Sequence, residues 1–311
     1  MKMNRRELLA VALGVSGNAW AKRGKIDRHR FGSITDESGA TPAEALAFAQ
    51  KHGLQWMEIR AVPGLRKHYA DLTPEELKQA AREFREAGVK VSFFNSGQCK
   101  YLLPGTEALR SRQETPEQRS ARMAREKMLF ERREEDLRKS IRAAQAFGVD
   151  KVRIFAFLRT VDPGKDMQRI VDILGGLVKI AEREGIRLAL ENEVACNVAR
   201  CDEMAAYVKA IPSKHFGLNW DALNGKHMHE AEFPEGYGLI PKDKLWNVQI
   251  KGKSILKQYA AWIDWAPIFG ALERDGYREQ IGLECHIFGP DLIAKSHESM
   301  AEMIRIAEKR S

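Results

Sequence analysis

The chain has 311 residues, of which 44% are hydrophobic and 30% are charged, a balance that is typical of a globular protein and excludes a disordered chain. No run of about 18 uncharged apolar residues occurs beyond the N-terminus, so we expect no membrane span in the mature protein. The formal net charge is +8, and Lys2, Arg5, Arg6 and Glu7 contribute a net +2, which leaves the rest at about +6, a modest excess.

The N-terminus has the pattern of an export signal. The pair Arg5-Arg6 precedes the apolar run 8–15, and Ala19-Trp20-Ala21 has the small-x-small form of a cleavage site. The paired arginines favour the twin-arginine route, and hence the periplasm. We therefore expect residues 1–21 to be a signal and 22–311 to be the mature domain, with a helical N-terminus of a soluble protein as the alternative.

Strand-like apolar runs then alternate with helical patterns along the chain. The expected strands are 31–35, 54–62, 89–95, 152–157, 186–191, 215–220, 245–251 and 281–284. The expected helices are 42–52, 73–88, 116–147, 165–184, 202–210, 262–275 and 290–309. Thr41-Pro42 and Thr73-Pro74 are typical helix starts, with an N-cap followed by proline.

Two longer segments and a charged region stand out. Segments 96–117 and 223–243 follow strands three and six, and loops of this length usually carry function, so we expect them to shape the pocket or a subunit contact. In region 108–140 the basic residues are interleaved with glutamate. This mixture indicates a solvated helix face, so we predict no nucleic-acid partner.

Eight strands, seven of them followed by a helix, predict a parallel α/β fold. A single-domain (β/α)₈ TIM barrel is favoured over an open sheet, because no Gly-x-Gly-x-x-Gly follows a strand and polar residues end several different strands. The four cysteines include no Cys-x-x-Cys pair, which argues against structural zinc. Cys196 and Cys201 could form a disulfide in an oxidising compartment, or both could stay as buried thiols.

Carboxylates end three of the last four strands. Glu191 ends strand five, Asp221 strand six and Glu284 strand eight. The C-terminal ends of barrel strands converge on one mouth, and clustered carboxylates repel one another unless a cation neutralises them. Hard oxygen ligands suit Mg²⁺ or Mn²⁺, so these residues predict a divalent-metal site.

This arrangement resembles the xylose-isomerase-like TIM-barrel superfamily of sugar isomerases and epimerases, over roughly residues 31–305. The residues that carry the resemblance are Glu191-Asn192, Asp221-x-x-Asn224, Glu284, Glu58 on strand two, Trp262-Ile263-Asp264-Trp265, and Gly276-Tyr277 before Gly282-Leu283-Glu284. The resemblance implies that Glu191 and Glu284 act as an acid/base pair beside a divalent metal (Mn²⁺, Mg²⁺ or Zn²⁺), which polarises a carbonyl and stabilises an enediolate.

One departure concerns strand seven, where the family usually has His-x-Lys and this chain has Gln249-Ile250-Lys251. An amide oxygen can bind a hard cation, so we expect Gln249 as the fourth ligand, with a water or a nearby histidine as the alternative. The expected substrate-binding residues are Lys251, His286, Glu193, Asn224 and His227. Further pocket candidates are Arg60, Asn95 and Arg153.

The resulting hypothesis is a metal-dependent isomerase or epimerase of a sugar or sugar derivative, acting by proton abstraction next to a carbonyl. A keto-glycoside lyase shares the first step and is the close alternative. A non-catalytic sugar-binding barrel is the alternative from another class, and Gln249 supports it. The sequence leaves a homo-oligomer open.

Overall fold

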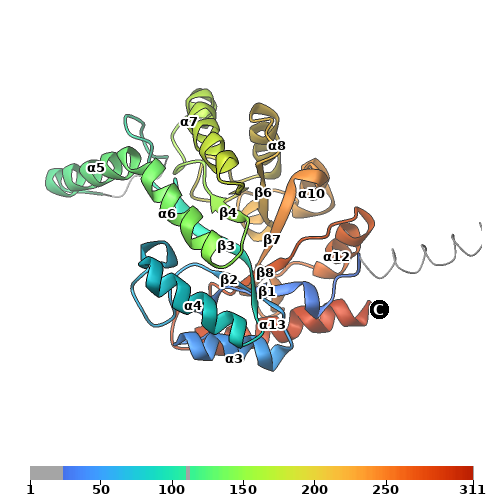
Figure 1. Ribbon diagram of the computed structural model, residues 1–311. Helices are drawn as coiled ribbons and strands as arrows, with labels where there is room; N and C mark the ends of the chain where they lie inside the picture. Colours follow the sequence, from blue (N-terminus) through green and yellow to red (C-terminus); the bar gives the residue numbers. More distant parts are fainter. Residues whose placement is uncertain (1–23, 110–112, 311) are drawn as a thin grey trace, which may run out of the picture.

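The computed structural model describes residues 24–109 and 113–310, and the expected export signal lies outside them. Eight parallel strands form one sheet in the order β1-β8-β7-β6-β5-β4-β3-β2 (Figure 1). The strands are β1 Phe31–Ser33, β2 Trp56–Ile59, β3 Lys90–Gln98, β4 Lys151–Ile154, β5 Arg187–Glu191, β6 Phe216–Asp221, β7 Leu245–Lys251 and β8 Ile281–Glu284. A bridge between Ile34 and Glu58 brings the ends of the sheet together into a nearly closed barrel, as predicted.

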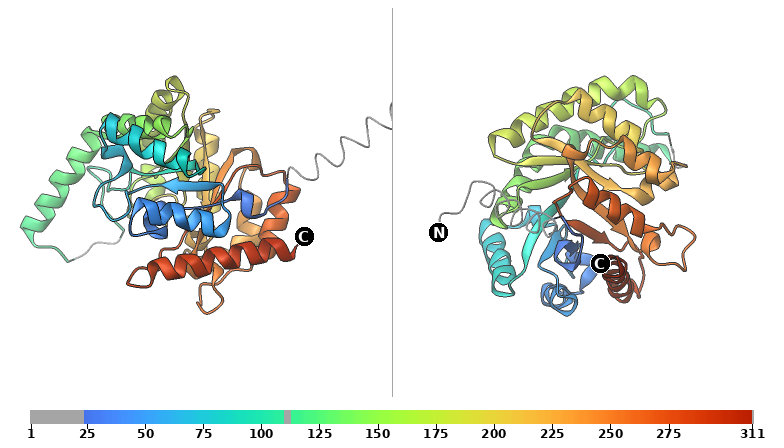
Figure 2. Two further views of the ribbon diagram at one scale, coloured as in Figure 1. Left: turned by 60° about the horizontal axis from the view of Figure 1, so that its bottom comes forward. Right: turned by 90° about the vertical axis from the view of Figure 1, so that its right-hand side faces the viewer.

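Helices surround the barrel between successive strands (Figures 1 and 2). They are α2 Thr35–Ser38, α3 Pro42–His52, α4 Pro74–Glu86, α5 Pro116–Glu131, α6 Arg133–Ala146, α7 Pro163–Arg183, α8 Cys201–Ala210, α9 Ala222–His227, α10 Tyr237–Leu239, α11 Gly252–Ile255, α12 Trp265–Arg274 and α13 Leu292–Lys309. None of those in the described ranges is long and apolar enough to span a membrane.

The predicted helix starts are confirmed by their caps. Thr41 accepts a hydrogen bond from the backbone N–H of Glu44, and Thr73 forms a capping box with Glu76. Gly53 ends α3 with φ 65°, a conformation that glycine adopts without a Cβ clash.

The strands expected over 31–35, 54–62 and 152–157 are shorter in the structure, and two other expected elements differ in kind. The single helix expected over 116–147 is interrupted at Arg132, where α5 ends and α6 begins. Whereas α6 packs on the barrel, α5 projects from it and is mostly exposed (Figures 1 and 2), because it has few apolar residues to bury. The expected loop 223–243 contains the short helices α9 and α10.

The barrel interior holds both apolar and polar side chains, including the buried Lys151, which pairs with Glu279. Phe93, Ala189 and Trp246 form a small buried cluster of their own inside the sheet. The main hydrophobic core lies between the strands and the surrounding helices. All four cysteines are buried free thiols, so the possible pair of Cys196 and Cys201 is not a disulfide here.

Candidate active site

The last residues of four adjacent strands meet at the mouth of the barrel. Glu191, Asp221, Lys251 and Glu284 end β5, β6, β7 and β8 respectively. Because parallel strands have their C-terminal ends at the same edge, the register brings these side chains together, with Lys251 paired directly to Glu284.

The three carboxylates form one buried cluster. An oxygen from each of Glu191, Asp221 and Glu284 lies within 4.8 Å of the others, and none of these residues is more than 4% exposed. Their proximity confirms that the predicted residues converge. Uncompensated, three buried negative charges would repel one another strongly.

Each carboxylate has a cationic neighbour from this chain. Arg153 Nη1 donates to Glu191 Oε2 at 3.0 Å, and Arg60 Nη1 donates to Glu284 Oε1 at 2.7 Å. Lys251 Nζ lies 3.0 Å from Asp221 Oδ2. The sequence placed both arginines in the pocket, and the structure shows that they compensate the glutamates.

The two glutamates differ in proton affinity. Burial raises the pKa of Glu191 to about 7, despite the nearby Arg153 guanidinium. Burial alone would raise the pKa of Glu284 too, but Lys251, Arg153 and Arg60 together lower it to about 2. A pair of carboxyl groups separated in this way can divide the acid and base roles near neutral pH.

Asp221 is fixed by the turn that follows β6. Its Oδ1 accepts from the backbone N–H of Asn224 at 3.1 Å and caps α9, whereas its buried Oδ2 faces the Lys251 ammonium. Asn224 also accepts from Lys251 Nζ at 3.1 Å and donates to the backbone oxygen of Asn192. Asn224, predicted to bind substrate, therefore positions Lys251.

Beneath the carboxylates lies a layer of buried amides around Glu58. Glu58 accepts from Asn95 at 2.7 Å, from Asn247 at 3.1 Å and from Gln249 at 3.2 Å. Burial raises the pKa of Glu58, because these neutral donors offset desolvation less than a cation would. We call Glu58, Asn95, Asn219, Asn247 and Gln249 the inner layer.

Gln249 belongs to this inner layer. Its amide nitrogen donates to Glu58, and its oxygen accepts from Asn247 at 3.1 Å. Its role as the fourth metal ligand therefore stays a prediction. A Cβ on Gly282 would lie 2.0 Å from Glu58 Oε1, so the absence of a side chain there leaves room for Glu58.

The inner layer also reaches the mouth. Asn219 Nδ2 donates to Glu191 Oε2 at 2.7 Å, and Asn247 donates to Asn219 Oδ1 at 3.1 Å. Glu191 Oε2 is thus held by Arg153 from one strand and by Asn219 from another, which fixes its direction.

A second group lies on the β1–β8 side of the mouth. Arg60 donates to Glu37 Oε1 at 2.7 Å as well as to Glu284. His286 Nδ1 lies 3.6 Å from Glu284 Oε1 and 3.4 Å from Glu37 Oε1, and its ring is partly open to solvent. His286 thus reaches the site, as predicted, although β8 ends before it and its φ is 55°.

The remaining predicted substrate residues separate into two cases. Glu193 follows β5 and pairs with Lys100 at 2.7 Å, so the long segment after β3 reaches the mouth as expected. His227 is exposed at the end of α9 and makes no hydrogen bond or ion pair with the site residues described above. Its contact with substrate remains a prediction.

Four contributors were missed from the sequence. They are Glu37, Lys100, Asn219 and Asn247. Period-two alternation offered a signal for the asparagines, because Asn219 lies two residues before Asp221 and Asn247 two before Gln249. Glu37 and Lys100 lie outside this pattern, in a helical turn and a loop.

The donor set suits a hard divalent cation. Glu191, Asp221 and Glu284 offer carboxylate oxygens, and the buried Asp221 Oδ2 has only the Lys251 ammonium, at 3.0 Å, as a neighbouring donor among the described residues. Glu37, Glu284 and His286 form a second group with suitable donor types, but the Arg60 guanidinium bridges its two glutamates.

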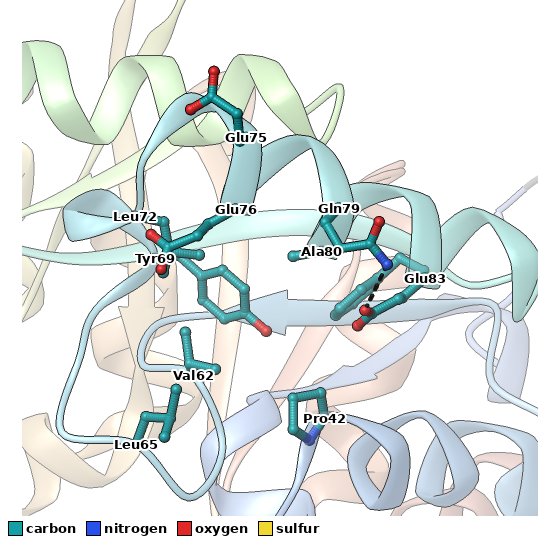
Figure 3. A pocket seen from close by; sticks show the side chains of 11 residues that line it. Pro42, Val62, Leu65, Tyr69, Leu72, Glu75, Glu76, Gln79, Ala80 and Glu83 are labelled. Carbon is teal, nitrogen blue, oxygen red and sulfur yellow. Dashed lines mark hydrogen bonds between the residues drawn. The ribbon is translucent and has the colours of Figure 1, made fainter.

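A separate cavity of about 410 Å³ lies outside the barrel, between α4, the loop after β2 and the start of α3 (Figure 3). Tyr69 lies in its middle, with Val62, Leu65 and Pro42 on one side and Gln79 and Glu83 on the other. It contains none of the clustered carboxylates, and its walls are mainly apolar.

Comparisons with known proteins agree with the geometry. A family model described as xylose isomerase-like TIM barrel matches residues 46–305. No curated protein matches the chain.

Several solved structures share the fold. One is the IolI protein with a bound zinc atom, at 17% identity, a TM-score of 0.65, and coverage of 91% of this chain and 99% of that one. Another is the 3-keto-D-glucoside 4-epimerase YcjR from E. coli, at 15% identity, a TM-score of 0.64, and coverage of 88% and 98%. A third is the D-allulose 3-epimerase from Methylomonas sp., at 17% identity, a TM-score of 0.65, and coverage of 92% and 99%.

Proposed function

The chain belongs to the xylose isomerase-like TIM-barrel family, and from this premise we propose that it is an isomerase or epimerase of a sugar or sugar derivative. The observation that carries the proposal is the convergence of Glu191 and Glu284 in one buried cluster at the barrel mouth. Two carboxyl groups so close can act on one carbon atom of a bound sugar.

The reaction would move a proton on the carbon next to a carbonyl. Glu284 is held in its ionised form by Arg60, Arg153 and Lys251, so it would take the proton. Glu191, whose pKa is about 7, would return a proton either to the same carbon from the other face, or to the neighbouring carbon while the hydroxyl proton passes to the former carbonyl oxygen. The first outcome is epimerisation and the second is isomerisation.

The enediolate formed between these steps needs positive charge beside its oxygen. Lys251, buried at the end of β7 and directed toward Asp221, would donate a hydrogen bond to that oxygen. His286 and Lys100, at the open side of the mouth, would contact more distant hydroxyl groups.

A divalent cation would be held by Glu191, Asp221 and Glu284. When bound, it would polarise the carbonyl oxygen and lower the cost of forming the enediolate. We propose that the reaction requires this cation, which would be Mn²⁺, Mg²⁺ or Zn²⁺.

The test is a panel of carbonyl sugars, with and without added Mn²⁺, Mg²⁺ or Zn²⁺. Because the similar structures include enzymes named for 3-keto-D-glucoside, D-allulose and L-ribulose, these compounds open the panel. Product identification by NMR should reveal an epimer or isomer. Release of an aglycone from a keto-glycoside would instead assign the lyase reaction, and saturable binding without turnover would assign a sugar-binding protein.

The location is proposed separately. Arg5-Arg6 and the apolar run 8–15 support export to the periplasm by the twin-arginine route. Cell fractionation should place the protein in the periplasm, and replacing both arginines by lysine should retain it in the cytoplasm. Equal export of both forms would contradict this route.

A further inference from the structure

The ammonium group of Lys251 lies among the carboxylates that would hold a metal ion. Its Nζ is 3.0 Å from Asp221 Oδ2 and 3.1 Å from Asn224 Oδ1, and the residue is only 8% exposed. Its charge also interacts with Glu191, Glu193 and Glu284. Lys251 therefore acts on the whole cluster rather than on a single partner.

Cations of this chain already compensate part of the negative charge of the cluster, although Arg60 is shared with Asp36 and Glu37. Glu191, Asp221 and Glu284 carry three negative charges when ionised, and Arg153, Lys251 and Arg60 supply three positive charges at 2.7 to 3.0 Å. A divalent ion entering this arrangement would meet the buried cations Arg153 and Lys251 and the partly buried Arg60. Their repulsion would offset much of its attraction to the carboxylates.

Strand seven offers no charged or free ligand whose binding could offset this repulsion. Gln249 is neutral, and both ends of its amide are engaged within the inner layer, with Glu58 and with Asn247. Moving its oxygen toward the mouth would break the bond from Asn247 and leave buried polar groups without partners. This observation is independent of the position of Lys251.

We infer that the Lys251 ammonium is the resident cation of the carboxylate cluster, and that a divalent ion binds there only by displacing it. The catalytic consequence of this inference rests on the proposed function, but its test does not. Metal occupancy would then depend on the metal concentration around the protein, and the folded site would persist without an ion. A substrate oxygen that draws Lys251 away from Asp221 would favour metal entry.

The test is calorimetric titration of Mn²⁺ into the full mature protein. The wild type should bind weakly, and Lys251→Met should bind about 100-fold more tightly, because the variant removes the competing charge and leaves Asp221 without its cation. Lys100→Met is the matched control, since it removes an equal charge at the mouth from a lysine that pairs with Glu193. Its affinity should change less than about threefold.

Equal affinity of Lys251→Met and Lys100→Met would overturn the inference. Should Lys251→Met fail to fold, the wild type decides the question. After dialysis against metal-free buffer it should contain far less than one ion per chain, and EDTA should leave its melting temperature unchanged. One retained ion per chain, with a lower melting temperature in EDTA, would also overturn the inference. Because no substrate is used, failure of the proposed reaction would not affect either outcome.

Discussion

The mouth and the inner layer of the barrel both bury carboxyl groups, but they stabilise them in different ways. At the mouth, Glu284 is surrounded by Arg60, Arg153 and Lys251, and its pKa falls to about 2. One layer below, Glu58 has only amide partners, and burial raises its pKa. Cationic neighbours therefore keep charge available where a substrate can arrive, whereas amides provide a framework with little charge.

The largest difference between the layers should appear in activity. Glu284→Gln or Glu191→Gln should lower turnover of a converted sugar by about 10³-fold, because either change removes a proton-transfer group. Glu58→Gln should lower it by less than about tenfold, since Glu58 acts only through its neighbours. Steady-state kinetics of the three variants would check this. Equal losses in all three would remove the functional distinction between the layers.

Stability should depend on the cations at the mouth. Arg153→Met should reduce the free energy of unfolding by about 3 kcal/mol, because it leaves the buried Glu191 carboxylate without its guanidinium partner. Arg28→Met, which breaks the exposed pair with Glu308, should cost less than about 1 kcal/mol. Urea unfolding measures both. Similar costs would show that Glu191 does not depend on its cation.

The stability of the inner layer should depend on the room available to Glu58 rather than on charge. Gly282→Ala should destabilise the protein by about 2 kcal/mol, because the added Cβ would overlap Glu58. Gly176→Ala, in the open part of α7, is the matched control and should be neutral or stabilising by up to about 1 kcal/mol. A neutral Gly282→Ala in thermal unfolding would mean that Glu58 can move freely.

The smallest expected effect is a difference in pH dependence. The raised pKa of Glu58 means that its protonated form is favoured in the folded protein, so its contribution is present below about pH 4.5 and is lost as the pH rises. The contribution of Glu284 to stability changes with pH in the opposite direction. It is present above about pH 4.5 and is lost as the pH falls toward about 2.

Unfolding free energies at pH 5 and pH 8 report on Glu58 alone of these two, because the contribution of Glu284 changes only below about pH 4.5. The wild type should lose more stability than Glu58→Gln as the pH rises from 5 to 8. The same slope in both proteins would show that Glu58 is already ionised at pH 5.

The sequence predicted the barrel and the converging carboxylates because both depend on local pattern. Apolar runs in the sequence indicate where strands end, and parallel strands have their C-terminal ends at the same edge of the sheet. The break at Arg132 was not predicted, because helical character continues on both sides of it. Nor was Glu37, which reaches the mouth from a helical turn rather than from a strand. The pairing of the carboxylates with Arg153, Lys251 and Arg60 depends on contacts between different strands, which periodicity within one strand does not report.

The central claim is that Glu191 and Glu284 move a proton on the carbon next to a carbonyl. It is tested most directly by deuterium uptake from D₂O at that carbon, measured by NMR on a sugar from the panel. The account predicts uptake with the wild type and a loss of about 10³-fold in Glu284→Gln. Conversion of a sugar with no deuterium at that carbon, or equal uptake with Glu284→Gln, would contradict it.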